Sequence, residues 1–181
     1  MTDDSDVFAL SEVATARAQL AFATLAAQLF ALLPNAEIEH VGATAVPGCL
    51  SKGDLDVVVR VARPEFDASV SVLDGVLRRS GRNAPTGEYV EYDAASEGIA
   101  ASVQLLVAGS DLDDRFRRLK AMLLADRAAL ADYNELKVRC AGGSMSAYRQ
   151  AKAELIDAML AADEAPSDVT LCLTLRPGIH E

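Results

Sequence analysis

The segment that most constrains the fold is residues 41–61, which read VGATAVPGCLSKGDLDVVVRV. Its first half has the glycines and the proline typical of a turn, and its second half, residues 55–61, is mostly apolar. A strand that is apolar on both faces is typical of the interior of a sheet, so we expect other strands on both sides of it. Asp54 and Asp56 stand at the beginning of this strand, where two neighbouring negative charges need a compensating partner.

The composition is that of one folded domain in a reducing compartment. The chain has 181 residues, of which 51% are hydrophobic, enough to bury a core. Its three cysteines, Cys49, Cys140 and Cys172, are far apart, and the two histidines are His40 and His180. This number and spacing support neither a disulfide framework nor a zinc site, so we expect a cytoplasmic protein.

The charge balance limits the partners that the chain can have. The formal net charge is −10, which disfavours non-specific binding to nucleic acid and to anionic membranes. A small anionic ligand remains compatible with it where lysines, arginines or a metal ion offset the charge locally. The uncharged residues 18–36 are interrupted by Gln19, Thr24 and Gln28, so we expect a buried helix, or one packed in a homodimer, and no membrane span.

Hydrophobic periodicity and turn residues predict the secondary structure. Helices are predicted at residues 11–33, 64–79, 112–125, 127–140 and 145–162, and strands at 36–41, 55–61, 88–93 and 99–107. Residues 94–98 are predicted to join the last two strands as a hairpin, and residues 169–175 alternate like a terminal strand.

Strands and helices partly segregate along the chain, which predicts an α+β fold with a helical C-terminal region. We divide the chain into a flexible acidic N-terminus, an α/β core, a helical subdomain, and a linker with the terminal strand and tail. These segments are residues 1–10, 11–110, 111–162 and 163–181.

The two aspartates suggest a metal site. Residues i and i+2 of a strand point to the same face, so Asp54 and Asp56 are expected to project together. Paired carboxylates suit Mg²⁺, with Mn²⁺ as the alternative, because hard cations prefer oxygen ligands and share them with substrate phosphates. Gly42 and Gly48, in the loop before them, allow the backbone to approach such phosphates closely.

Several stretches resemble one family. The stretch IEHVGATAVPG resembles IEHIGSTSVPG of the GrpB family, and FRRLKAMLLADRAALADYNELK and AYRQAKAELI resemble that family's C-terminal motifs. The glycine loop followed by Asp54-Leu55-Asp56 also resembles the general nucleotidyltransferase pattern. The resemblance extends over residues 38–160 and implies the polymerase-β-like nucleotidyltransferase fold. This fold is a small mixed sheet with flanking helices and a helical tail that helps to hold a nucleotide.

The resemblance assigns roles to individual residues. The nucleotidyltransferase pattern implies that Asp54 and Asp56 bind the metal, although many GrpB members have the aspartate only at the position of Asp56. A third catalytic carboxylate is expected from a nearby strand, where Glu91 and Asp93 share a face, and Glu91 is the preferred candidate. Several other residues are implied to contact the nucleotide. The implied nucleotide or phosphate contacts are Gly42, Ala43, Thr44, Ser51, Lys52, Lys137, Tyr148 and Lys152. The chain departs from the family at Ala43, where a serine is usual, and at Gln104, where a histidine is usual.

Three functions remain open at this point. The first is a Mg²⁺-dependent nucleotidyltransferase that transfers a nucleotidyl group from a nucleoside triphosphate to an unknown acceptor. The second is a catalytically degenerate module that binds a nucleotide, a coenzyme A precursor or a related small anion. The third is a structural dimerisation protein with a vestigial cleft.

Overall fold

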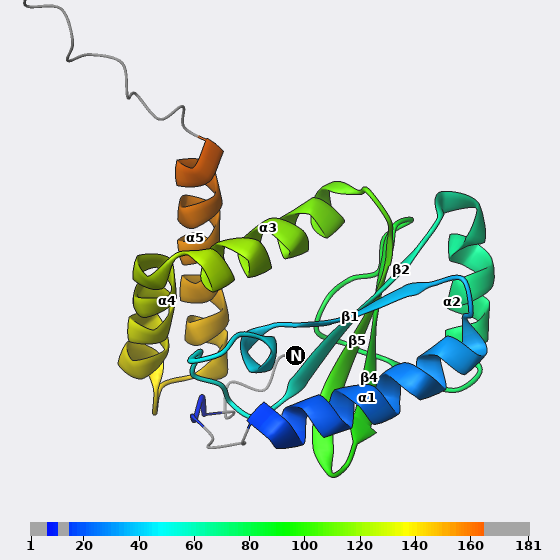
Figure 1. Ribbon diagram of the computed structural model, residues 1–181, viewed down its shortest axis with the longest axis horizontal. Helices are drawn as coiled ribbons and strands as arrows, with labels where there is room; N and C mark the ends of the chain where they lie inside the picture. The colour runs from blue at the N-terminus through cyan, green and yellow to red at the C-terminus, as the bar shows by residue number, and fades with distance from the viewer. Residues whose placement is uncertain (1–6, 11–14, 165–181) are drawn as a thin grey trace, which may run out of the picture.

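The structure, a computed structural model, describes residues 7–10 and 15–164 (Figure 1). In chain order the elements are α1 (Thr15–Leu32), β1 (Glu37–Val41), η1 (Ala43–Ala45), β2 (Leu55–Val61), η2 (Arg63–Glu65), α2 (Phe66–Asp74), β3 (Arg78–Arg79), β4 (Tyr89–Ser96), β5 (Ile99–Val107), α3 (Asp111–Ala125), α4 (Arg127–Cys140) and α5 (Met145–Glu164). The predicted division into four segments stays a prediction, and the expected strand at 169–175 lies outside the described residues.

The five strands form one mixed sheet in the order β1-β2-β5-β4-β3. Strands β2 and β5 run parallel, and all other neighbours run antiparallel. Strand β2, as predicted, lies between two others, which explains why it is apolar on both faces. The predicted small mixed sheet with flanking helices is therefore confirmed.

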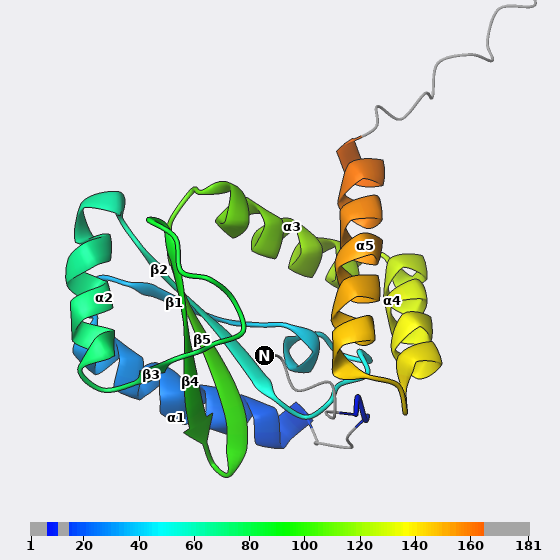
Figure 2. The same ribbon diagram turned by 180° about the vertical axis from the view of Figure 1, so that it is seen from behind.

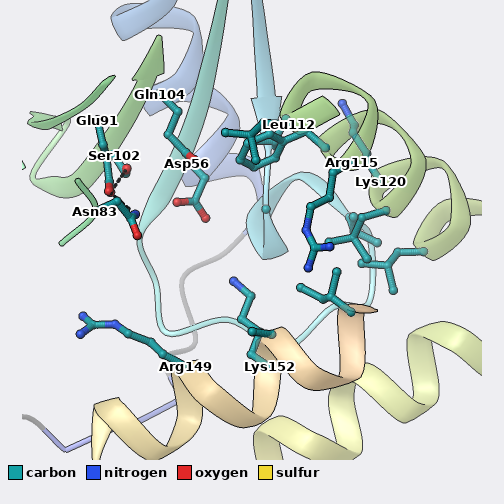
Figure 3. Close-up of a pocket in the computed structure, with 18 of the residues that line it drawn as sticks. Asp56, Asn83, Glu91, Ser102, Gln104, Leu112, Arg115, Lys120, Arg149 and Lys152 are labelled. Atoms are coloured by element: carbon teal, nitrogen blue, oxygen red, sulfur yellow. Dashed lines mark hydrogen bonds between the residues drawn. The ribbon is translucent and has the colours of Figure 1, made fainter. Parts of the chain in front are cut away.

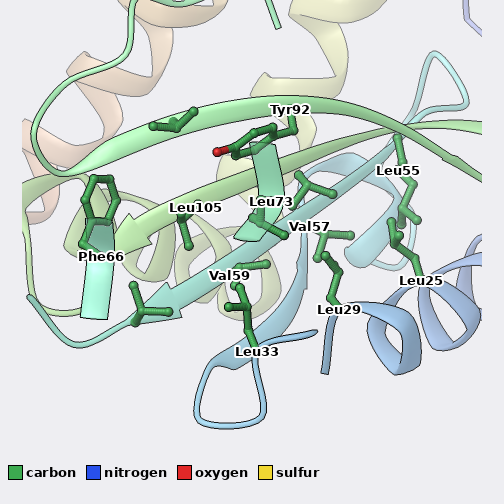
Figure 4. Close-up of a cluster of buried hydrophobic side chains, with 14 of the residues drawn as sticks. Leu25, Leu29, Leu33, Leu55, Val57, Val59, Phe66, Leu73, Tyr92 and Leu105 are labelled. Carbon is green, nitrogen blue, oxygen red and sulfur yellow. The ribbon is translucent and has the colours of Figure 1, made fainter. Parts of the chain in front are cut away.

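One face of the sheet packs against α1 and α2 and forms the main core (Figure 4). Leu55, Val57 and Val59 alternate along β2 toward this face, and all three are fully buried. Leu25 and Leu29 of α1 pack against them at helical spacing. This alternation fixes the opposite orientation for Asp56, which must therefore face away from the core.

The other face of the sheet carries polar residues and lies against α3 (Figures 1 and 2). Arg60 of β2 is completely buried there and forms ion pairs with Asp113 of α3 and with Glu39 of β1, the latter at 2.6 Å. Lys120 of α3 also pairs with Glu39, at 2.5 Å. These contacts hold α3 at a fixed place over the polar face.

Helices α4 and α5 form the C-terminal part, beside the end of the sheet where β2 begins (Figure 1). Their contact is apolar, with Tyr133, Ile156 and Leu160 buried in one cluster that also includes Val46 of the loop after η1. The described N-terminal residues pack here too, because the Phe8 ring stacks on Tyr148 with centroids 3.8 Å apart. Among the described residues, no helix has the length and apolarity needed to cross a membrane.

Two predicted boundaries are wrong for local reasons. The hairpin between β4 and β5 has a two-residue turn at Glu97 and Gly98, not the five-residue connection 94–98. Both residues have positive φ, as a type I′ turn requires, and the strands therefore extend further. The helix predicted at 64–79 ends at Asp74, and the chain then enters the short strand β3.

Candidate functional site

A cavity of about 380 Å³ lies between the polar face of the sheet and helices α3 and α5 (Figure 3). Its size is within the usual range for small-molecule sites. Its charged lining residues are Asp56, Glu91, Arg82, Arg115, Lys120, Arg149 and Lys152. Strands supply the two carboxylates, and helices and one loop supply the five cations, so the lining has an excess of positive charge.

Asp56 is the predicted metal ligand that the structure places in this cavity. Its position in β2 is paired with Val41 of β1 and Ser102 of β5, on the polar face. Its carboxylate points into the cavity and accepts no hydrogen bond from the described residues (Figure 3). Burial, and after it the charge of Asp54, raise the pKa of Asp56 to about 6, while Lys152 opposes the rise.

A glycine is required at position 42 because the Asp56 carboxylate occupies the space beside it. A Cβ atom on Gly42 would lie 2.2 Å from Oδ2 of Asp56, far inside van der Waals contact. Gly42 also has φ 72° and ψ −167°, a conformation essentially restricted to glycine. The glycine of this loop therefore makes room for the carboxylate, in addition to any contact that its backbone makes with a ligand.

Lys152 faces Asp56 from the other side of the cavity (Figure 3). Burial alone would lower its pKa, but Tyr133, Tyr148 and Asp56 raise the pKa above its ordinary value, so the side chain stays charged. Arg149, one turn earlier on α5, also lines the cavity, and no carboxylate of the described residues pairs with it. Asp56 and two cations of α5 thus make up the centre of the site.

Asp54 is placed differently from Asp56. It precedes β2, forms an ion pair with Lys52, and is not among the lining residues. Its backbone carbonyl accepts a hydrogen bond from the Thr44 hydroxyl at 3.2 Å. The structure therefore brings one aspartate of the predicted pair into the cavity and leaves the other, with Lys52, beside it.

Glu91, the predicted third carboxylate, lines the cavity but has its oxygens occupied. Oε1 accepts hydrogen bonds from Arg82, at 2.7 Å from Nη2, and from Ser102, at 2.7 Å. Oε2 accepts one from Asn83 at 2.6 Å. Although burial raises the pKa of Glu91, these bonds hold it below its ordinary value, so the carboxylate stays ionised and paired.

The remaining residues predicted to contact phosphate in the glycine loop mainly hold the loop itself. Thr44 is nearly buried and forms a hydrogen bond of 2.9 Å with His40. Ser51 accepts a hydrogen bond from the Gly53 amide at 2.9 Å. Ala43 opens the short helix η1 and is not in the cavity lining. Of this loop, Gly42 and Val46 reach the cavity.

Lys137 and Tyr148 have structural contacts in place of a position in the cavity lining. The Lys137 ammonium lies 3.1 Å from the Cys49 sulfur, donates to the Leu50 carbonyl, and lies 4.2 Å from the centroid of Tyr133. Burial lowers its pKa. Tyr148 stacks on Phe8, as described above. Lys137 thus joins α4 to the loop that precedes β2.

The sequence did not single out several lining residues, namely Arg82, Asn83, Ser102 and Arg149. Ser102 lies directly beside Asp56 across the β2–β5 pair, which only the strand register reveals. Arg149 precedes Lys152 by three residues on a helix, so the two lie on the same helix face. This spacing was the one feature of the sequence that indicated a position for Arg149 beside Lys152. Arg82 and Asn83 come from an irregular loop whose path the sequence does not define.

The carboxylates present fit one kind of metal site. Among residues 7–10 and 15–164, no group of three or more His, Cys, Asp or Glu side chains is placed to hold a metal ion. Mg²⁺, however, is often held by one or two carboxylates together with substrate phosphates. Asp56, with Asp54 beside it, therefore fits a cation that is shared with a ligand, not one held by the protein alone.

The fold is a small mixed sheet with flanking helices, and the acidic end of strand β2 faces the basic helix α5 across the cavity. Residues 13–162 match the family model described as GrpB protein. A UPF0157 protein of Vibrio cholerae is 32% identical over 134 residues, which is 74% of this chain and 70% of that protein. The chain therefore belongs to the GrpB family.

A solved structure from the GrpB family has a similar fold. The crystal structure of the conserved protein GrpB from Enterococcus faecalis matches with a TM-score of 0.57 at 16% identity, over 83% of this chain and 99% of that one. A structure of the Cid1 poly(U) polymerase with MgGTP bound matches with a TM-score of 0.46 at 15% identity, over 67% and 41% of the two chains. No residue role is taken from either structure.

Proposed function

We propose that this protein binds a nucleoside triphosphate together with Mg²⁺ in the cavity and transfers a nucleotidyl group to an acceptor hydroxyl. The observation that carries the proposal is the position of Asp56, a carboxylate that accepts no hydrogen bond from the described part of the chain, opposite Lys152 across the cavity (Figure 3). A carboxylate and cations on opposite walls suit a ligand that brings both phosphates and a metal ion.

Each lining group has a role in this proposal. Lys152 and Arg149 bind phosphate oxygens, because neither has a carboxylate partner that fully satisfies it. Asp56, with Asp54 beside it, would hold Mg²⁺, or Mn²⁺ in its place. When bound, the metal ion neutralises charge on the phosphates and polarises the reacting phosphorus.

The proposed reaction is an in-line displacement. The acceptor oxygen attacks the α-phosphorus and forms a new P–O bond, while the bond from this phosphorus to the bridging oxygen breaks and pyrophosphate leaves. The proton of the acceptor hydroxyl passes to Asp56, the lining carboxylate whose oxygens are not already hydrogen-bonded.

The test is calorimetric titration with ATP, GTP, CTP and UTP, each with Mg²⁺, with Mn²⁺ and with chelator. We expect Asp56→Asn to weaken metal-dependent binding by about tenfold or more, since it removes one charged metal ligand. Asp132→Asn is the matched control, because Asp132 is exposed on α4 and outside the cavity. Equal affinities of wild type and Asp56→Asn for every nucleotide would refute the proposal.

A second function, nucleotide or coenzyme A precursor binding without chemistry, is favoured by one observation. Glu91, the position expected to supply a third carboxylate, is fully engaged by Arg82, Asn83 and Ser102. A binding module would be stabilised by its ligand. The two functions are separated by assaying pyrophosphate release with the bound nucleotide and a panel of hydroxyl acceptors, since only the enzyme releases it.

A further inference from the structure

The cavity has two chemically different ends, with Asp56 and Lys152 between them (Figure 3). We infer that the end formed by α3 is a separate subsite for a small molecule with an apolar body and one anionic group. On the function proposed above, this molecule is the acceptor. The inference commits to a small molecule, not to a nucleic acid or a protein chain.

One end of the cavity is polar. Asn83, Glu91 and Ser102 lie together at this end, and Arg149 lies below them on α5 (Figure 3). Their side chains offer hydrogen-bond donors, acceptors and a free cation, which suits a phosphorylated and sugar-like ligand. This end and the central Lys152 are therefore sufficient to bind the nucleotide without the other end.

The other end of the cavity is apolar. Leu112, Phe116 and Leu119 follow one another at spacings of four and three residues on α3, so they share one helix face. All three are only partly buried, although they are large apolar side chains, because they line the cavity. Leu123 and Ile156 close this end from the cluster between α3 and α5. A ligand that buried these side chains would gain about 25 cal/mol per Å² of apolar area removed from water.

Two cations border the apolar end. The Arg115 guanidinium points into the cavity, and Lys120 lies behind it (Figure 3). Lys120 is engaged by Glu39 and by the His40 carbonyl, at 2.5 and 2.8 Å. Arg115 pairs with Asp157 at 2.6 Å, but both side chains are solvent-exposed, and such pairs contribute little. A carboxylate or sulfonate on the ligand can therefore replace Asp157.

The same end is poorly suited to a nucleobase or a polymer. Its polar side chains, Arg115 and Lys120, are both donors, whereas the edge of a base needs acceptors as well. At Phe116 and Leu119 the backbone of α3 offers no further groups, because amides and carbonyls in the interior of a helix are hydrogen-bonded within it. A polymer would also meet the negative charge of the chain as a whole, which is −10.

The experiment uses 1-naphthoate as the apolar anion and acetate as its polar counterpart, each titrated into the full-length protein. We expect 1-naphthoate to bind and acetate not to bind. Leu119→Asn should weaken 1-naphthoate binding by about tenfold, since it removes apolar contact area. Leu124→Asn, on the same helix but 55% exposed, should change the affinity by less than about twofold. Thermal unfolding of both variants shows whether each is folded.

The charge requirement is tested in parallel. Arg115→Gln should weaken 1-naphthoate binding by about fivefold, as expected when a charged hydrogen bond is lost. Arg139→Gln is the matched control, because Arg139 is an exposed arginine of α4 outside the cavity. Unchanged binding in Leu119→Asn or in Arg115→Gln would overturn the inference.

Competition with nucleotide separates this inference from the proposed function. We expect the affinity for 1-naphthoate to be the same in the presence of saturating ATP and Mg²⁺. Displacement of 1-naphthoate by ATP would assign the apolar end to the nucleoside and overturn the inference, while the proposed function would stand. Binding of 1-naphthoate, lost in Leu119→Asn, without any nucleotide binding would refute the proposed function and leave the apolar subsite supported.

Discussion

Replacing Gly42 by alanine should disturb the protein through two separable effects. The first is backbone strain, because φ 72° with ψ −167° is a glycine conformation and costs about 1–3 kcal/mol for other residues. The second is steric, because the new Cβ would lie 2.2 Å from Oδ2 and 2.9 Å from Cγ of Asp56. Forced overpacking of this kind costs about 1–3 kcal/mol.

The sum predicts that Gly42→Ala lowers the free energy of unfolding by about 2–6 kcal/mol. Domains of this size lose about 2–4 °C in Tm for each kcal/mol, so thermal unfolding measures the effect easily. Gly48→Ala is the matched control, since Gly48 has φ 79° in the same loop but its Cβ would meet only a Leu130 methyl at 3.8 Å. It should cost only the backbone strain, about 1–3 kcal/mol.

A double-mutant cycle isolates the contact with the carboxylate. An Asp56→Ala background removes the contacts with Oδ2 and Cγ and keeps the one with Cβ, at 2.9 Å. Gly42→Ala should therefore cost less than in wild type, by up to about 3 kcal/mol. Urea denaturation of the four proteins gives this coupling free energy. An equal cost of Gly42→Ala in both backgrounds would show that the contact with Asp56 does not explain the glycine, and the reasoning would be refuted.

Three further predictions concern charged side chains. The pKa of Asp56 is raised in the folded state, so ionisation of Asp56 destabilises the fold as the pH rises from 4 to 6. The gain in free energy of unfolding that Asp56→Asn produces should therefore grow over this range, to at most about 3 kcal/mol, and thermal unfolding that shows a shrinking gain would contradict the prediction. Arg60→Met removes the buried cation that pairs with both Asp113 and Glu39, while Asp113 keeps Arg117 and the Gly109 amide, and it should cost about 3 kcal/mol in urea. The exposed Arg63→Met should cost less than about 0.5 kcal/mol, and equal costs would contradict the prediction. Lys137→Met should lower the free energy of unfolding by about 1–3 kcal/mol and leave nucleotide affinity unchanged, whereas Lys152→Met should weaken nucleotide binding about tenfold. Calorimetric titration in which Lys137→Met weakens nucleotide binding and Lys152→Met does not would contradict the different roles given to the two lysines.

The sequence predicted the regular elements well where one periodicity dominates. Strand β2 has the predicted bounds, and α4 spans the predicted residues 127–140. Both are long enough for burial to be read from the spacing of apolar residues. The turn at Glu97 and Gly98 was misplaced because a glutamate with positive φ has no reliable sequence signal.

The predicted aspartate pair shows a limit of the rule that residues i and i+2 of a strand share a face. Residues i and i+2 point to the same face only where both lie within a strand. Strand β2 begins at Leu55, so Asp54 precedes it. Asp54 lies in the loop before it, where the backbone is free to turn the side chain toward Lys52. The strand rule therefore located Asp56 in the site, while the position of Asp54 depended on a loop conformation that the rule does not cover.

The two tyrosine–lysine pairs show a second limit. Spacing of four residues correctly puts Tyr133 with Lys137 and Tyr148 with Lys152 on one face each. It does not say which member of a pair reaches the cavity, and here Tyr133 and Lys152 do so. The crossing of α4, α5 and the loop before β2 decides this, and it is a tertiary property.

The distribution of charge explains how an acidic protein can present a basic cavity. Among the lining cations, Arg82 is neutralised by Glu91, Lys120 by Glu39, and Arg115 in part by Asp157. Lys152 faces Asp56 at the centre of the cavity, and Arg149 adds a positive charge at its polar end (Figure 3), while the chain as a whole carries −10. Screening limits each field to about 8 Å at physiological ionic strength. A small anion inside the cavity is therefore attracted by α5, whereas a long polyanion would be repelled by the acidic residues outside it.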